Sequence, residues 1–98
     1  MKIKEGVIIQ GLSIRMRPVL IAASKIWEEL GEELVITCAL DGDHSPGSLH
    51  YYGLAVDLRT RYFSEYEAQK AFTRLTEELP DYVIVLEESH IHVQCKTY

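Results

Sequence analysis

The four histidines of this 98-residue chain are confined to residues 44–92. His90 and His92 stand two positions apart in an alternating segment, so a strand there projects both imidazoles from one face. Asp57 lies in a second alternating segment, and His50 precedes it by seven residues. If these two strands pair or are neighbours, the carboxylate and the imidazoles converge above one face of the sheet.

Two histidines and a carboxylate are a known ligand set for catalytic zinc. Three protein ligands leave a fourth position for water, whose pKa then falls to about 7. A nearby carboxylate, Glu87 or Glu88, could take the proton as that water attacks a carbonyl, and a neighbouring histidine could stabilise the developing oxyanion. The competing interpretation is a solvent-exposed polar strand face without metal, and the spacing alone leaves both open.

Hydrophobic periodicity predicts the elements that must position these residues. Apolar residues at three- and four-residue steps indicate two helices, and alternating or β-branched runs indicate strands. Ser64 with Glu67 is a capping-box pattern that starts the second helix. The predicted order is an edge strand or extended arm at Val7–Gln10, a helix at Pro18–Leu30, strands at Glu33–Ala39 and Gly53–Arg59, a helix from Ser64 to before Pro80, and strands at Tyr82–Leu86 and His90–Lys96.

This order predicts an α+β fold, a small antiparallel sheet with two helices on one face. The length allows a single domain over residues 1–98. Ten basic and fifteen acidic residues leave a net charge of −5, which argues against a nucleic-acid partner. No apolar run approaches the length of a membrane span, and no export signal is visible at the N-terminus. Cys38 and Cys95 lack the spacing of a disulfide framework or a zinc pair.

The stretch from Ser48 to Asp57 reads S-L-H-Y-Y-G-L-A-V-D. It resembles the S-x-H-x-x-G-x-A-x-D motif of the LAS-type zinc peptidases, which include D-Ala-D-Ala carboxypeptidases and dipeptidases and peptidoglycan endopeptidases. The segment Glu87–His92, E-E-S-H-I-H, resembles their second motif, an acidic residue followed by His-x-His. Both segments are also similar to the zinc-bearing signalling domain of hedgehog proteins, so the resemblance implies a hedgehog-like fold.

The resemblance implies that His50, Asp57 and His92 bind zinc. It also implies that Glu87 is the general base and that His90 stabilises the transition state.

Further roles implied by the resemblance are a hydrogen bond from Ser48 within the site and a position beside the metal for His44. If the alternation of a strand extended back from His90, Glu88 rather than Glu87 would lie on the face of the histidines. Glu87 can reach the bound water only if the chain turns or bulges before His90. Glu88 is therefore the alternative base. Asp41 and Asp43 resemble part of the calcium loop of hedgehog proteins, although Asx-turns also explain them.

The function that the resemblance implies is hydrolysis of a peptide bond in peptidoglycan stem peptides by a zinc-bound water. The alternatives are a zinc-stabilised binding module without turnover and a domain without metal. Residues 37–40 lack the arginine that carboxypeptidases of this group use for the substrate carboxylate. Arg59 or Arg61 would have to replace it, and an endopeptidase is favoured. Without an export signal, the expectation is either a phage-encoded enzyme released to the cell wall or a cytoplasmic enzyme that recycles wall peptides.

Overall fold

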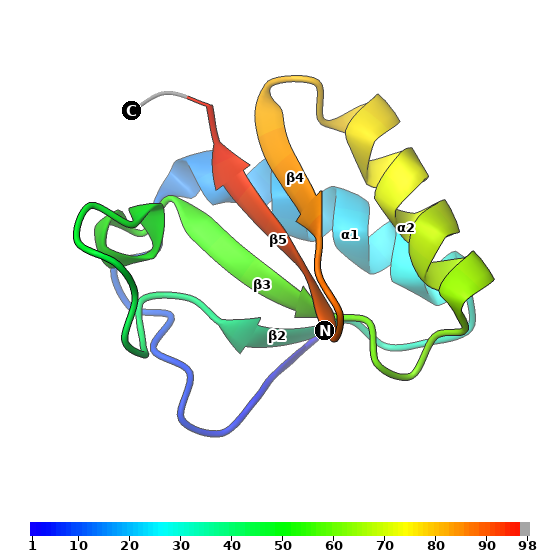
Figure 1. Ribbon diagram of the computed structural model, residues 1–98, viewed down its shortest axis with the longest axis horizontal. Coiled ribbons are helices and arrows are strands. Elements are labelled where there is room, and N and C mark those ends of the chain that lie inside the picture. Colours follow the sequence, from blue (N-terminus) through cyan, green and yellow to red (C-terminus); the bar gives the residue numbers. More distant parts are fainter. Residues whose placement is uncertain (97–98) are drawn as a thin grey trace.

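Five strands form one sheet, and two helices cover one of its faces (Figure 1). The computed structural model describes residues 1–96 of the chain. The strands lie in the order β1-β2-β3-β5-β4. The elements along the chain are β1 Lys2–Ile3, the 3₁₀ helix η1 Ile14–Met16, α1 Arg17–Glu29, β2 Val35–Cys38, the 3₁₀ helix η2 Leu49–Tyr52, β3 Ala55–Arg59, α2 Glu65–Glu78, β4 Tyr82–Leu86 and β5 His90–Cys95.

The α+β class and the order of the elements are confirmed, but the purely antiparallel sheet is wrong. β1 pairs with β2 in parallel, whereas the β2–β3, β3–β5 and β4–β5 pairs are antiparallel. The reason is the connection: the chain leaves β1, passes through α1 and returns as β2. A crossover of this kind brings the second strand back in the same direction as the first.

The first strand lies earlier in the chain than predicted. Residues 7–10 form the extended arm that was the alternative to a strand, and Ile8 accepts a hydrogen bond from the Leu40 N–H (3.0 Å). The ladder to β2 is made instead by Lys2, whose N–H donates to Leu34 (2.8 Å), and by Lys4, whose N–H donates to Ile36 (3.0 Å). The chain turns away from β2 between these two segments, so the arm runs beside residue 40 rather than beside the strand.

Both helices begin and end close to the predicted positions, and both bury their apolar stripe on the sheet. Pro18 lies in the first turn of α1, where its missing N–H costs no hydrogen bond. Ser64 and Glu67 form the predicted capping box of α2. Trp27 of α1 is fully buried and donates its indole N–H to the Arg59 carbonyl (2.9 Å). That bond ties α1 to the end of the strand that carries Asp57.

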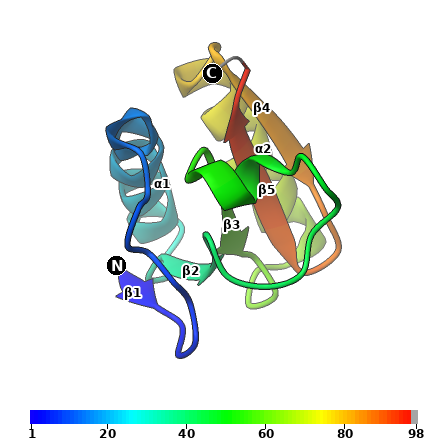
Figure 2. The ribbon, with the colours of Figure 1, turned by 90° about the vertical axis from the view of Figure 1, so that its left-hand side faces the viewer.

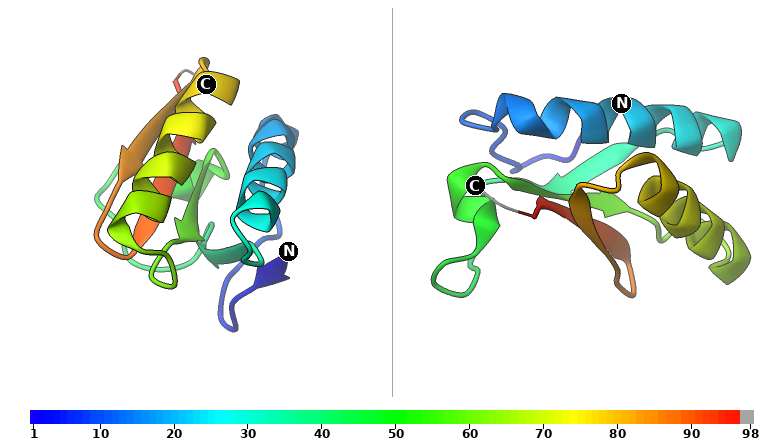
Figure 3. Two further views of the ribbon diagram at one scale, coloured as in Figure 1. Left: turned by 90° about the vertical axis from the view of Figure 1, so that its right-hand side faces the viewer. Right: turned by 90° about the horizontal axis from the view of Figure 1, so that it is seen from above.

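The two faces of the sheet have opposite character, as the alternation predicts. The face toward the helices buries apolar residues of the central strands, and α1 and α2 lie on that side (Figure 3); these residues are Ile36, Val56, Leu58, Ile91 and Val93. The other face carries Asp57, Arg59, His90 and His92. The loop that contains η2 lies on this polar side, away from α1 (Figure 2), so it can bring His50 to the strands.

Candidate metal centre

The pairing of β3 with β5 brings the predicted ligands together. Asp57 lies directly opposite His92 in the register, and its Oδ1 is 3.0 Å from Nδ1 of that histidine. The same Oδ1 is 3.3 Å from His50 Nε2. The three ligand atoms all lie within 4.8 Å of one another, a spacing that can hold one metal ion. The convergence expected for these residues is therefore present in the fold.

His50 reaches the site from the 3₁₀ helix η2, and the local sequence explains how. Ser48 caps this helix by accepting a hydrogen bond from the His50 N–H (3.3 Å), so Ser48 bonds to the backbone of a candidate ligand. Gly53 ends the helix with φ +70°, and a Cβ atom there would lie 2.3 Å from the Gly11 carbonyl oxygen. The glycine of the motif is thus required by backbone packing as well as by conformation.

Hydrogen bonds to the second nitrogen of each imidazole show which nitrogen is free to bind a metal. His50 Nδ1 lies 2.7 Å from the Ala39 carbonyl, and His92 Nε2 lies 2.7 Å from Gln94 Oε1. Because an oxygen of this kind only accepts, each of these nitrogens carries the proton. The other nitrogens, His50 Nε2 and His92 Nδ1, face the same Asp57 oxygen. Each can donate a hydrogen bond to that oxygen when it is protonated, and it offers its lone pair to a metal ion that takes the place of the proton. Metal-binding histidines are typically oriented in this way.

The charge state of Asp57 also suits a metal ligand. Its carboxylate is largely buried, which by itself raises the pKa, but the hydrogen bonds from His50 and His92 outweigh burial and hold the pKa below its usual range. The hydrogen bond to Asp57 in turn raises the pKa of His92, against the effect of burial. In the metal-free protein a proton on His92 therefore occupies the place that a cation takes on binding.

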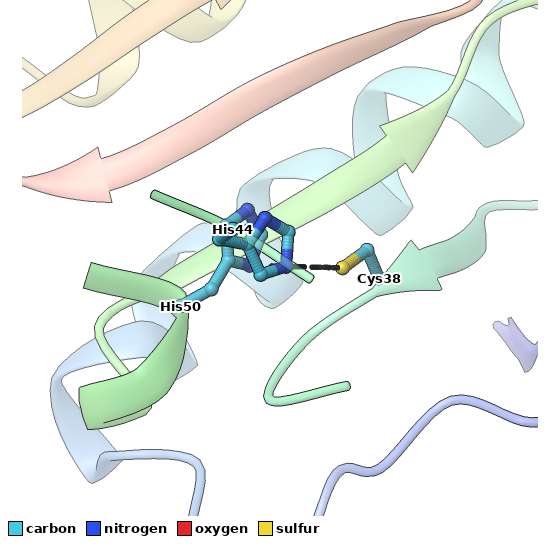
Figure 4. A group of neighbouring side chains, drawn as sticks. All are labelled: Cys38, His44 and His50. Carbon is cyan, nitrogen blue, oxygen red and sulfur yellow. Dashed lines mark hydrogen bonds between the residues drawn. The ribbon is translucent and has the colours of Figure 1, made fainter. Parts of the chain in front are cut away.

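Cys38, His44 and His50 form a second group, which shares His50 with the first (Figure 4). Cys38 Sγ lies 3.3 Å from His44 Nε2 and 3.9 Å from His50 Nδ1. Both nitrogens also face carbonyl oxygens, since His44 Nε2 is 2.9 Å from Asp41 O. Burial, together with the nearby charges of Asp41 and Asp57, raises the pKa of the Cys38 thiol to about 12.

The thiol and the two ring nitrogens lie within hydrogen-bond distance of one another and of the Ala39 and Asp41 carbonyls. We therefore interpret this group as a hydrogen-bonded support for His50. The ring of His44 stacks on the ring of His50, with centroids 4.2 Å apart and planes 10° apart. His44 was expected beside the metal, and it lies against His50, one of the three candidate ligands.

His90 and the two glutamates occupy different surroundings. His90 Nε2 is 3.7 Å from Asp57 Oδ2, and its side chain is 31% exposed, so it lies beside the ligands on the open face. β5 begins only at His90, and the Glu87 N–H donates to the His90 carbonyl (2.9 Å). That bond continues the β4–β5 register, in which Leu86 lies opposite Ile91, by one more pair, so Glu87 lies opposite His90 and on the same face of the hairpin. Among residues 1–96, the carboxylates of Glu87 and Glu88 form no hydrogen bond or ion pair with a site residue.

Two contributors to the site are absent from the sequence-based prediction. Gln94 orients His92, and Cys38 lies against His44 and His50. Gln94 carries a usable signal, because it follows His92 by two residues and so shares its face. Asp41 accepts hydrogen bonds from the N–H groups of Ala39 and Ile8 (3.0 Å each), so loop geometry accounts for this residue.

Neither the known protein families nor the curated protein sequences contain a match to this chain. No helix within residues 1–96 has the length and apolar character needed to cross a bilayer. The geometry of the site carries its chemistry: one ring nitrogen from each of His50 and His92 and one carboxylate oxygen of Asp57 converge on the polar face of the sheet.

Proposed function

We propose that this protein is a zinc-dependent peptidase that hydrolyses a peptide bond in peptidoglycan stem peptides. The observation that carries the proposal is the convergence of His50 Nε2, His92 Nδ1 and Asp57 Oδ1, with the remaining protons of both imidazoles held by oxygen acceptors. The resemblance of the two motifs supplies the reaction and the substrate class.

Zinc is the metal that these ligands fit best. Zinc bonds of about 2.0–2.1 Å at tetrahedral angles place ligand atoms about 3.3 Å apart. The separations of 3.0 and 3.3 Å around Asp57 Oδ1 are close to that value. Imidazole and carboxylate ligands with an open fourth position are typical of catalytic rather than structural zinc. When bound, zinc supplies a Lewis acid that polarises a carbonyl and makes water nucleophilic near neutral pH.

The chain's own residues provide the remaining steps. Glu87, in the turn before β5, is assigned as the general base that takes the proton from the attacking water. His90 lies 3.7 Å from Asp57 on the solvent side of the ligands, where its ring can donate a hydrogen bond to the developing oxyanion. Glu88 is adjacent in the same turn and is the alternative base. A wall substrate also requires delivery to the wall, which release on phage lysis would provide.

The test combines metal analysis with mass spectrometry of digested muropeptides. The native protein should contain one zinc per chain and release a defined peptide fragment. Asp57→Asn should lose zinc, whereas Glu87→Gln should keep zinc and lose cleavage. Glu88→Gln is the matched control from the same turn and should keep both. Protein that contains no zinc after expression in zinc-supplemented medium and does not bind added zinc would refute the proposal.

One observation favours the alternative, a zinc-stabilised binding module without turnover. Both glutamates are exposed in the turn, and neither contacts the ligands within the described chain. For a binding module, the Glu87→Gln and native proteins should behave identically, with full zinc content and no hydrolysis of any muropeptide. Cleavage that depends on zinc and on Glu87 excludes this alternative.

A further inference from the structure

Besides supporting His50, the group of Cys38, His44 and His50 has the composition of a metal site of its own (Figure 4). The three ligand atoms all lie within 4.8 Å of one another. Cys38 Sγ is 3.3 Å from His44 Nε2 and 3.9 Å from His50 Nδ1. Metal bonds of about 2.3 Å to thiolate and about 2.0–2.1 Å to imidazole place sulfur and nitrogen about 3.6 Å apart at a tetrahedral angle. The two observed separations lie on either side of that value.

Three separate segments bring these side chains together. Cys38 ends β2, His50 lies in η2, and His44 lies in the loop between them. Gly42 of that loop has φ +86°, and a Cβ atom there would lie 3.4 Å from His44 Nε2 and 3.9 Å from Cys38 Sγ. The Tyr51 hydroxyl accepts a hydrogen bond from the His44 N–H and donates one to the His44 carbonyl (2.9 Å). The backbone of the loop therefore fixes the position of His44 beside the sulfur.

The negative charges near the sulfur favour a cation. Burial, followed by the charges of Asp41 and Asp57, raises the pKa of the Cys38 thiol, and the positive charge of Lys4 has the opposite and smaller effect. The two carboxylates also attract a cation that binds at the sulfur. Because they hold the proton on the thiol, a metal ion must bond strongly to sulfur in order to displace it. Cys38 and His44 are both partly exposed, so an ion can reach them from solvent.

We propose that Cys38, His44 and His50 bind a soft metal ion of the Cu⁺ class, which takes His50 away from zinc. Thiolate ligands select soft ions, and imidazole suits copper, so one thiolate with two imidazoles fits Cu⁺. The group of His50, Asp57 and His92 has no sulfur ligand and offers a carboxylate instead. When the Cu⁺–sulfur bond forms, the thiol proton passes to solvent and no electron is transferred.

Competition for His50 follows from the single ring proton of a neutral imidazole. Zinc binding at Nε2 leaves the proton on Nδ1, which faces the Ala39 carbonyl at 2.7 Å. Cu⁺ binding at Nδ1 moves the proton to Nε2, where Asp57 Oδ1 lies 3.3 Å away and accepts it. His44 changes tautomer in the same way, because its Nε2 now faces the Asp41 carbonyl (2.9 Å). The loss of zinc rests on the proposed function for zinc at this centre, whereas Cu⁺ binding itself does not.

Anaerobic titration with Cu⁺ tests the site directly. Cu⁺ is supplied as its coloured complex with the chelator bicinchoninate, and loss of the colour measures the transfer of Cu⁺ to the zinc-loaded protein. Gel filtration and elemental analysis then measure the zinc that stays bound. We expect one Cu⁺ bound and one zinc released per chain. No uptake of Cu⁺, or uptake with all of the zinc retained, overturns the proposal.

Variants assign the bound Cu⁺ to this group. Cys38→Ser removes the thiolate but keeps a hydrogen-bonding side chain, and His44→Gln removes one imidazole. Loss of a partner that only orients a ligand lowers metal affinity by about 10- to 100-fold. Loss of either direct ligand should therefore lower Cu⁺ affinity by at least about 100-fold. Cys38→Ser should still bind zinc.

Cys95→Ala is the matched control, because Cys95 is the other cysteine and lies in the core, 1% exposed and 3.7 Å from the Met16 sulfur. This variant should bind Cu⁺ as the native protein does. Thermal unfolding verifies that each variant is folded. Cu⁺ binding that is unchanged in Cys38→Ser, or lost in folded Cys95→Ala, overturns the proposal.

The outcomes also separate this proposal from the proposed function. His92→Gln removes a zinc ligand but none of the residues proposed to bind Cu⁺. It should lose zinc and bind Cu⁺ at least as tightly as the native protein, because no zinc competes for His50. Zinc-dependent cleavage together with Cu⁺ uptake that does not depend on Cys38 refutes the Cu⁺ site and leaves the peptidase intact. Cu⁺ binding that depends on Cys38, in a protein that never holds zinc, refutes the peptidase and supports the Cu⁺ site.

Discussion

Replacing Gln94 tests the reasoning that assigns the metal-binding nitrogens. Its side-chain oxygen lies 2.7 Å from His92 Nε2 and keeps a proton on that nitrogen. Nδ1, on the side of Asp57, is then the nitrogen that can exchange its proton for a metal ion. Gln94→Met removes the acceptor and keeps a side chain of similar length. The imidazole can then adopt the other tautomer, with a proton on Nδ1 where a metal must bind.

The expected loss follows from the role of such bonds at metal sites. Removing a partner that orients a histidine ligand typically lowers metal affinity by about 10- to 100-fold, or about 1.4 to 2.7 kcal/mol. The 2.7 Å separation and the half-buried position of His92 place this bond among the stronger examples, so we expect a loss toward the upper end of that range. Gln94→Glu retains an acceptor and should bind zinc at least as tightly as the native protein.

The assay is competition for zinc between the protein and a chromophoric chelator at pH 7, with thermal unfolding of the metal-free variants as the control for folding. The Gln94→Glu variant should bind zinc at least as tightly as the native protein. Both should bind zinc much more tightly than the Gln94→Met variant. Equal affinity of the Met variant and the native protein would mean that Gln94 does not set the tautomer of His92, and the assignment of Nδ1 as the ligand atom would be wrong.

Three further predictions concern the frame around the site. Gly53→Ala should destabilise the protein by about 1–3 kcal/mol in urea unfolding, because φ is +70° and the new Cβ would lie 2.3 Å from the Gly11 carbonyl oxygen; an unchanged midpoint would contradict this packing. Ser64→Ala should cost about 1 kcal/mol in the same assay, through the loss of the cap of α2; Ser45→Ala, in the exposed loop, is its control. Burial raises the pKa of Asp41, but hydrogen bonds from the Ala39 and Ile8 N–H groups outweigh it and lower the pKa below its usual value. The stabilisation from ionised Asp41 is therefore fully present above the unfolded-state pKa of about 3.9 and is lost as pH falls through the lower folded-state pKa. Unfolding of Asp41→Asn between pH 7 and pH 3 should show a smaller dependence on pH than that of the native protein, and identical pH profiles would refute this role.

Local sequence patterns were sufficient to predict most of the helices and strands and to predict which of their faces are apolar or polar. The helix that starts near Pro18 and the one capped by Ser64 are both present, because capping and apolar spacing are properties of neighbouring residues. The common face of His90 and His92 follows from the two-residue period of a strand. The arm at residues 7–10 was harder to predict, since a short apolar segment carries no signal for what it lies beside.

The residues of the candidate metal centre could be predicted from the sequence for a similar reason. His50 and Asp57 belong to one motif, and the register of β3 with β5 places Asp57 opposite His92. The choice between Glu87 and Glu88 as the proposed general base could not be made in the same way. Counting back along one strand from His90 favoured Glu88, whereas the register of β4 with β5 places Glu87 opposite His90.

By itself, the sequence determined the order of the elements, the polar and apolar faces of the central strands and the residue types able to bind a metal. These depend on the spacing of residues near one another in the chain. Only the tertiary structure decided which nitrogen of each histidine faces Asp57, that Cys38 supports His50, and that β1 pairs with β2 in parallel. Each of these depends on contacts between distant segments, such as the Ala39 carbonyl with the His50 ring or β1 beside β2. Such contacts are set by strand register and crossover direction, which no local period encodes.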